Sequence, residues 1–346
     1  MTILAIDFFC GVGGATKGFQ NAGVQVLKGI DNDPSCKETY ERNCFPATFL
    51  LRDINDLKPK EILNGIDLSE KDHLFFIACA PCQPFSKIGK GSKVDASLIL
   101  TFGKFVKQLK PDIVFVENVP GLADAEQGLI LSEFLQVLES GEVRYEYEWN
   151  IVDAKSYGVP QTRERFILLA SAIGKIPFPS ETHGKNLLPY VTVRKKISKY
   201  PPIAAGKEHP TVPNHAASAL SKLNLKRIQN TPRDGGSRKD WPLFLWLNCH
   251  KKSSGHTDVY GRMKWRESSP TLTCRCNSIS NGRFGHPEQD RAISLREAAA
   301  LQTYPDDFVF YGKKTKIARH VGNAVPPLIA EVFGRAICDY VDSVAS

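Results

Sequence analysis

Short apolar runs alternate with helical patterns along the first third of the chain, and this alternation limits the possible folds more than any other feature. Four runs have the length and composition of buried strands: residues 3–9, 24–30, 73–78 and 113–116. Between them, residues 34–43 and 98–110 have helical patterns. Strands that alternate with helices are typical of a parallel sheet with functional residues at its carboxyl edge. We therefore predict an α/β fold with a site at that edge.

A second domain is predicted from a change in composition. In the middle of the chain Pro, Gly, Asn and Lys become frequent, and no long periodic segment persists. Helical patterns return at residues 294–302 and 328–341, each with a suitable helix start. We predict one domain from residues 1–178 together with 292–346, and a smaller, irregular domain from residues 179–291.

Charge is also distributed unevenly. The chain carries 45 Lys+Arg and 37 Asp+Glu, a net charge of +8. Residues 180–290 hold 19 of these cations and 8 of these acids, a net charge of +11, which leaves −3 for the remainder. A basic segment in a near-neutral chain fits a surface that meets a polyanion such as nucleic acid, and a solvated basic surface is the plainer alternative.

Composition excludes several classes of protein. No run of 18 apolar residues is present, so we expect no membrane-spanning helix. The segment from Met1 to Asp7 reaches an acidic residue after a few apolar positions, unlike a signal peptide. The nine cysteines are odd in number and irregularly spaced, which predicts reduced thiols in a cytoplasmic protein.

The turn after the first predicted strand contains three glycines, in the order Asp7-Phe-Phe-Cys-Gly-Val-Gly-Gly14. Glycines let the backbone pass close to a ligand, and a helix N-terminus favours polar groups. Asp31 ends the second strand 20 residues after Gly11, where an acid can bind two ribose hydroxyls. A dinucleotide fingerprint would require glycine where Thr16 stands. A nucleoside without a pyrophosphate, such as S-adenosylmethionine, suits the turn better, and a purely structural turn is the alternative.

The apolar run at residues 73–78 ends in Cys79-Ala-Pro-Cys82-Gln-Pro-Phe-Ser86. A bare C-x-x-C could be a redox pair or half of a zinc site. Pro81 and Pro84 flank Cys82 and disfavour the helix that a redox pair uses. What remains is one cysteine on a rigid loop, followed by a lysine-rich segment whose charge would favour the thiolate. We interpret Cys82 as a nucleophile.

These two segments closely resemble the cytosine-C5 DNA methyltransferases of the bacterial modification type. Three further motifs follow in that family's order: Glu117-Asn118-Val119, Gln161-Thr-Arg-Glu-Arg165 and Gly322-Asn-Ala-Val-Pro-Pro327. The resemblance covers residues 3 to about 337 except the basic middle. It implies a Rossmann-like, S-adenosylmethionine-dependent methyltransferase sheet with a smaller, irregular target-recognition domain. The implied reaction is methyl transfer to carbon 5 of cytosine within a specific short sequence of double-stranded DNA.

The resemblance also implies roles for the catalytic residues. Cys82 would add to carbon 6 of a flipped-out cytosine, and Glu117 would donate a proton to ring N3. Arg165, together with Arg163, would hold the base through its O2 atom. Taken singly, the plainer interpretations are a salt-bridged carboxylate for Glu117 and a solvated basic pair for the arginines.

Cofactor and DNA contacts follow from the same resemblance. We expect Phe9 against the adenine, Asp31 on the ribose and Asp53 on the adenine amino group. The full set of expected cofactor contacts is Phe9, Gly11, Val12, Gly13, Asp31, Asn32, Asp53, Ile54, Pro81, Asn323 and Val325. Asn32 departs from the family pattern, in which a larger side chain often covers the adenine. The expected DNA contacts are Gln83, Ser86, Lys87, Lys90, Arg233, Arg238, Arg262, Arg275 and Arg283.

Several alternatives stay open. The same chemistry could act on tRNA, or the chain could be a catalytically silent DNA-binding protein. A redox protein using Cys79 and Cys82 is a third reading. We expect double-stranded DNA as partner, no membrane, no obligate protein partner and a monomer, working alone or beside a cognate restriction endonuclease. The pairs Cys249-His250 and Cys274-Arg-Cys276 have poor spacing for zinc, and we expect no metal.

Overall fold

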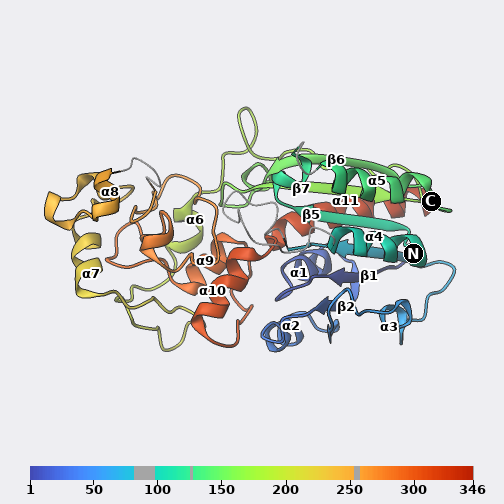
Figure 1. Cartoon of the computed structure of the whole chain (residues 1–346), viewed down its shortest axis with the longest axis horizontal. Coiled ribbons are helices and arrows are strands. Elements are labelled where there is room, and N and C mark those ends of the chain that lie inside the picture. Colours follow the sequence, from blue (N-terminus) through green and yellow to red (C-terminus); the bar gives the residue numbers. More distant parts are fainter. Residues whose placement is uncertain (82–97, 125–127, 253–257, 346) are drawn as a thin grey trace. The chain divides into compact units, whose positions relative to one another are not determined.

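A computed structural model of the chain describes residues 1–81, 98–124, 128–252 and 258–345 (Figure 1). The chain forms two compact units. The first comprises residues 1–157, 164–181 and 325–346, and the second comprises residues 158–163 and 182–324. None of the described helices is both long enough and apolar enough to cross a membrane.

The first unit is built on one seven-stranded sheet, in the order β3-β2-β1-β4-β5-β7-β6. Its strands are β1 (Ile3–Phe8), β2 (Gln25–Asp31), β3 (Thr48–Leu51), β4 (His73–Ala78), β5 (Ile113–Asn118), β6 (Glu146–Asp153) and β7 (Glu164–Ser171). Neighbours from β3 to β5 are parallel, whereas β7 runs antiparallel to both β5 and β6. The predicted α/β sheet is confirmed, with two antiparallel strands added at one edge, as mixed sheets often have.

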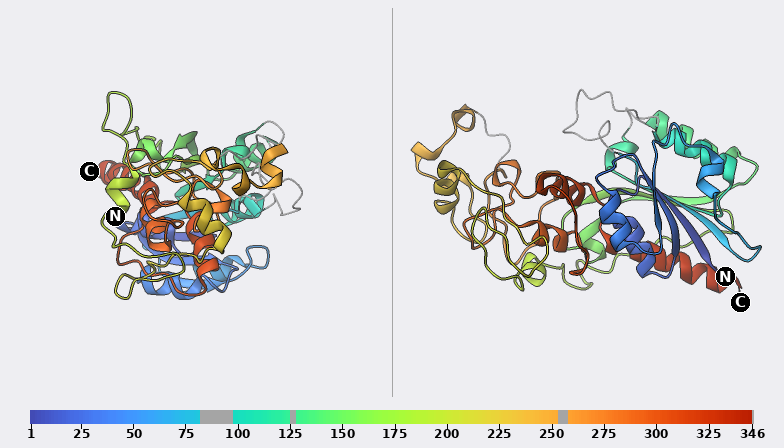
Figure 2. Two further views of the ribbon diagram at one scale, coloured as in Figure 1. Left: turned by 90° about the vertical axis from the view of Figure 1, so that its left-hand side faces the viewer. Right: turned by 90° about the horizontal axis from the view of Figure 1, so that it is seen from below.

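Helices cover both faces of this sheet (Figure 2). They are α1 (Gly14–Asn21), α2 (Lys37–Asn43), α3 (Pro59–Leu63), α4 (Leu98–Leu109), α5 (Gly128–Ser140) and α11 (Pro327–Ala345). On one face, Phe19 of α1 and Phe333 of α11 pack against Phe115 of β5. On the other face, Phe102 of α4 packs against Phe8 of β1. Because successive strand residues point to opposite faces, the sheet buries apolar side chains on both.

The second unit consists of short helices joined by long loops. The helices are α6 (Val193–Ile197), α7 (Lys222–Gln229), α8 (Asn248–Lys252), α9 (Leu295–Leu301) and α10 (Lys314–Asn323). Within the described portion of this unit, extended pairing is limited to isolated bridges such as that between Arg262 and Gly285.

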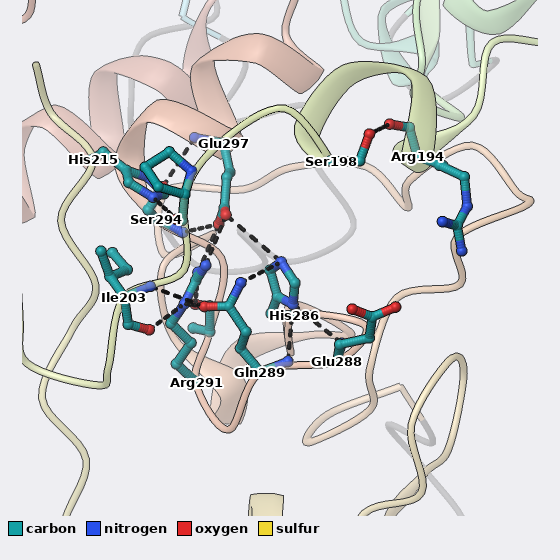
Figure 3. Close-up of polar contacts among 12 residues, drawn as sticks. Arg194, Ser198, Ile203, His215, His286, Glu288, Gln289, Arg291, Ser294 and Glu297 are labelled. Atoms are coloured by element: carbon teal, nitrogen blue, oxygen red, sulfur yellow. Dashed lines mark hydrogen bonds and ion pairs between the residues drawn. The ribbon is translucent and has the colours of Figure 1, made fainter. Parts of the chain in front are cut away.

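The second unit extends past residue 291, where the sequence analysis ended it, and a buried polar cluster gives the reason (Figure 3). Arg291 donates to both carboxylate oxygens of Glu297, at 2.7 and 2.8 Å, and both side chains are buried. Glu297 also accepts from the backbone N–H of Ser294, at 2.7 Å, and so caps α9. The Ser294 hydroxyl lies 2.8 Å from Nδ1 of His215. These contacts tie α9 to the preceding loops, so residues 292–324 belong to this unit.

Candidate active site

Two charged side chains meet where β5 ends. Arg165 Nε lies 2.8 Å from Glu117 Oε1, and the two side chains are only 15% and 10% exposed. Strand pairing explains the meeting, because antiparallel β7 places Ile167 opposite Glu117 and so brings its first residues beside the end of β5. A carboxyl and a guanidinium this close can act together on one polar ligand.

The segment that leads to Cys82 is bound to the same strand end. Asn118 Nδ2 donates to the carbonyl of Ala80 at 3.3 Å, and its Oδ1 accepts from the N–H of Val119 at 2.9 Å. The N–H of Cys79 donates to the carbonyl of Phe8 on β1 at 3.3 Å. Asn118 therefore positions this segment. The sequence analysis quoted Asn118 within a motif and assigned it no role.

Cys82 lies outside the described residues, as do four of the predicted DNA contacts, Gln83, Ser86, Lys87 and Lys90. The other thiol of the C-x-x-C segment is described. Burial raises the pKa of Cys79 well above its ordinary value, and the charges of Asp7 and Glu117 add to this effect. A thiol that stays protonated at neutral pH is a poor nucleophile and redox partner, which argues against the redox alternative.

The glycine turn between β1 and α1 is bound to the end of β2. The N–H of Gly11 donates to Asp31 Oδ2 at 2.9 Å, and that of Asp33 donates to Asp31 Oδ1 at 2.8 Å. Gly13 has a φ of 92°, and a Cβ there would lie 2.3 Å from Cys44 Sγ, so only glycine fits. Gly11 has a φ of 52°, but a Cβ there would meet no described atom within 4 Å. The turn thus leaves open space beside Gly11.

The surroundings of Asp31 fit a ribose. Burial raises the pKa of Asp31 above its ordinary value, and the backbone N–H donors of Asp33 and Gly11 oppose that effect. Each carboxylate oxygen accepts one of these bonds and has a second lone pair that a ribose hydroxyl can use. Together with the open space beside Gly11, this arrangement is compatible with S-adenosylmethionine.

Asp53, the residue predicted to bind the adenine amino group, is held as an ionised acceptor. Hydrogen bonds from Asn55 and from Asn32 keep the pKa of Asp53 below its ordinary value. Asn32 Nδ2 donates to Asp53 Oδ2 at 2.8 Å, a contact that the sequence analysis did not foresee. Ile54 is buried in the core that also packs against the half-buried Phe9, whose φ is 60°.

The remaining cofactor candidates belong to both units. Val12 and Val325 are buried in the first unit, where Pro81 is exposed. Asn323 is exposed in the second unit, and its Oδ1 accepts a hydrogen bond from Cys274 Sγ at 3.0 Å.

Arg163 does not have the surroundings predicted for a residue that binds the target base. It belongs to the second unit, where its buried guanidinium donates to the carbonyls of Leu272, Gly322 and Ala324 at 3.1 to 3.2 Å. Donors engaged with backbone carbonyls are not available to a substrate. We correct its role from base binding to holding the segment that contains Gly322 and Ala324.

Arg262 also departs from its predicted role as a DNA contact. Its side chain is 1% exposed and lies in a cage of acceptors. Its guanidinium donates to the carbonyls of Thr231, His286 and Ile228 at 2.8 to 2.9 Å and to Asp290 Oδ1 at 2.5 Å. A buried guanidinium with these partners cannot reach a base edge without unfolding its surroundings, so Arg262 is a structural residue.

The other four arginines that were predicted to contact DNA form two pairs, one buried or half-buried and one exposed. Arg238 is buried, and the half-buried Arg283 donates to the carbonyl of Gly235 at 2.9 Å and to Asp258 at 3.3 Å. Arg233 and Arg275 are exposed. Among the five predicted arginines, this exposed pair therefore stays a candidate for contact with DNA.

Comparison with known proteins shows which family the chain is similar to. The pattern of the C-5 cytosine-specific DNA methylase family matches residues 3–339. The chain is 40% identical to the Type II methylase M.HgiDII of Herpetosiphon aurantiacus, over 98% of this chain and 96% of that protein. It is 32% identical to the Type II methyltransferase M1.HphI of Haemophilus parahaemolyticus, over 97% of this chain and 87% of that protein.

Solved structures share the fold. A protein of E. coli described as a prophage-encoded DNA modification methyltransferase superposes with a TM-score of 0.78 at 20% identity, covering 99% of this chain and 100% of that chain. The Dnmt2 methyltransferase of S. pombe superposes with a TM-score of 0.64 at 16% identity, covering 99% of each chain. At these identities the likeness concerns the fold, and it bears out the predicted methyltransferase sheet.

Proposed function

The chain belongs to the C-5 cytosine-specific DNA methylase family and is a DNA cytosine-5 methyltransferase, and we propose that it methylates cytosine within one short sequence of double-stranded DNA through a covalent adduct on Cys82. The observation that carries this proposal is the largely buried Glu117–Arg165 pair at the end of β5. At the same strand end, Asn118 binds the segment that leads to Cys82. S-Adenosylmethionine, when bound, supplies an electrophilic methyl group.

The proposed reaction begins with the attack of the Cys82 thiolate on carbon 6 of cytosine. The new bond makes carbon 5 nucleophilic, because the electrons of the 5,6 double bond move toward N3. Glu117 then donates a proton to N3. Since Glu117 is ion-paired with Arg165 in the structure, it must first take up a proton. The guanidinium of Arg165 would hold the O2 atom of the cytosine.

After carbon 5 has gained the methyl group, it carries both the methyl group and its original proton. A base removes that proton, the 5,6 double bond re-forms, Cys82 leaves as a thiolate, and N3 returns its proton to Glu117. The target atom is inaccessible in a stacked duplex, so we propose that the cytosine is rotated out of the helix at a cost of a few kcal/mol. Contacts between the exposed cations of the second unit and the phosphates would offset this cost.

The covalent step is tested with a duplex that carries 5-fluorocytosine at the target position. Fluorine at carbon 5 cannot leave as a proton does, so the adduct should persist and be detected by denaturing gel electrophoresis. We predict that Cys82→Ser forms no adduct and transfers no methyl group, because an alcohol is a far weaker nucleophile at neutral pH. Cys79→Ser, at the protonated thiol three residues earlier, should still form the adduct. Substantial turnover by Cys82→Ser would contradict the covalent mechanism.

The names of two similar proteins support a proposal about the biological setting. Two similar proteins are named as Type II methylases or methyltransferases. We propose that this enzyme also acts in the cytoplasm as a monomer and protects DNA from a cognate restriction endonuclease.

A further inference from the structure

Two large apolar side chains are displayed on a short turn of the second unit, between α7 and α8. Leu243 and Phe244 are each 77% exposed in the single-turn helix η5 (Leu243–Leu245). Single exposed apolar residues are common on protein surfaces, but neighbouring ones form a patch of the kind that meets a partner. The mechanism proposed above assigns no role to this pair.

The turn is held in place by two buried side chains, Trp241 before it and Leu245 at its end. Trp241 and Leu245 belong to a small apolar core that also contains Tyr260. Trp241 Nε1 donates to Thr231 Oγ1 at 2.8 Å, and Trp246 Nε1 donates to the carbonyl of Trp241 at 3.1 Å. The exposed pair therefore stands on a fixed backbone, and little conformational entropy is lost when it contacts a partner.

The exposed pair Leu243 and Phe244, here called the apolar tip, lies in a segment that is rich in cations. Residues 221–252 contain eight Lys+Arg and two Asp+Glu, a net charge of +6, and two of these cations, Arg227 and Arg238, are buried. Arg227 Nε of α7 donates to the carbonyl of Leu245 at 3.0 Å and so fastens α7 to the turn. Lys222 and Lys226 on α7 are exposed. Figure 1 shows α7 and α8 next to each other in this unit. Positive charge around an apolar tip is complementary to a duplex, which has phosphates outside and apolar base faces inside.

We infer that Leu243 and Phe244 form a wedge that enters the bound DNA at one base step, while the neighbouring lysines bind phosphates. This inference rests on the proposed function and adds a contact to it. Apolar side chains such as Phe and Leu can insert between stacked base pairs and bend the duplex, and phosphate contacts offset the unstacking energy. The wedge would therefore distort the DNA at a fixed step of the recognised sequence.

The test measures the unstacking at each base step directly. Each duplex contains the sequence that the enzyme methylates and carries the fluorescent base 2-aminopurine at one position. The fluorescence of this base rises when its stacking is lost. The double variant Leu243→Ser with Phe244→Ser should lose the fluorescence rise at one step and bind the duplex about tenfold more weakly or worse. Phe244→Trp should retain both signals. The matched control is Leu129→Ser on α5, since Leu129 is also 77% exposed.

The salt dependence of binding distinguishes the contribution of the wedge from that of the lysines. The double variant removes no charge, so its slope of log Kd against log salt concentration should equal that of the wild-type enzyme. Lys226→Ala should lower the slope by about one. A changed slope in the double variant would contradict the wedge.

Two results would overturn this inference and leave the proposed function intact. In the first, the double variant binds and unstacks DNA as the wild-type enzyme does. In the second, the wild-type enzyme self-associates in gel filtration and the double variant does not, with unchanged DNA binding, which would assign the tip to a second copy of this chain. Failure of the proposed function would look different from failure of the wedge, because the wild-type enzyme would then transfer no methyl group to any duplex.

Discussion

Two arginines of one motif have different surroundings, although they are two residues apart. Arg165 pairs with Glu117, whereas Arg163 donates to backbone carbonyls in the other unit. We predict that Arg165→Lys keeps the free energy of unfolding within about 1 kcal/mol and lowers kcat about a hundredfold or more, because a planar donor at the reacting base is lost. Arg163→Lys should lower the free energy of unfolding by about 2 kcal/mol or more, because buried carbonyls lose donors.

Urea unfolding and single-turnover methyl transfer, measured on the same preparations, check this pair of predictions. Transfer by the folded Arg163→Lys enzyme should stay near the wild-type rate at a temperature where the variant is stable. An Arg163→Lys enzyme of normal stability and no activity would restore the base-binding role that we have withdrawn.

Gly11 offers a second test at the scale of one residue. A Cβ at Gly11 would enter the open space in which we place the cofactor. We predict that Gly11→Ala weakens S-adenosylmethionine binding about tenfold or more, as measured by isothermal titration calorimetry. Gly65→Ala is the matched control, since Gly65 also has a positive φ, of 75°, and open space around its missing Cβ. Equal affinities in the two variants would mean that the cofactor does not pass Gly11.

At the scale of elements, the sequence predicts buried segments well and edge segments poorly. Strands β1, β2, β4 and β5 lie where apolar runs predict them. Burial on both faces makes β1, β4 and β5 apolar throughout, and β2 is partly buried. Edge strand β6 was missed, since half of its residues are exposed, only one is fully buried, and its pattern is not apolar. Buried arginines were also mistaken for surface residues. Arg163 and Arg262 contradict the usual exposure of arginine, and only the acceptors that they bind in the structure reveal it.

A buried histidine in the loop before α9 leads to a prediction about how the free energy of unfolding depends on pH. Nδ1 of His286 accepts hydrogen bonds from the N–H groups of Glu288 and Gln289, at 3.1 and 3.0 Å, which requires a neutral ring. Burial lowers the pKa of His286 from 6.5 to about 4. Between these values the unfolded chain binds a proton that the native protein excludes, so the free energy of unfolding must fall as the pH falls from about 6.5 toward 4. We expect His286 to account for about 2 kcal/mol of that loss.

Urea unfolding at pH 7, 6 and 5 measures this loss, and His286→Asn is the comparison. The variant is expected to be less stable than the wild-type protein at pH 7, and the difference should shrink at pH 5. A difference that stays constant over this range would remove His286 as the origin of the pH dependence.

At the scale of the whole molecule, the middle of the chain differs from the remainder in net charge. Residues 180–290 carry a net charge of +11, and the remainder carries −3. An enzyme that reads one sequence in a long duplex needs a dedicated surface for this task beside its reacting groups. The size and charge of this segment therefore favour duplex DNA over tRNA as the substrate.

The substrate assignment is tested most directly by methyl transfer from tritium-labelled S-adenosylmethionine to unmethylated genomic DNA and, in parallel, to bulk tRNA. Bisulfite sequencing of the labelled polymer then locates the modified cytosines. We predict label in DNA, at carbon 5 of cytosines within one short sequence. Label in tRNA alone, or no label in DNA, would contradict sequence-specific DNA methylation by this enzyme.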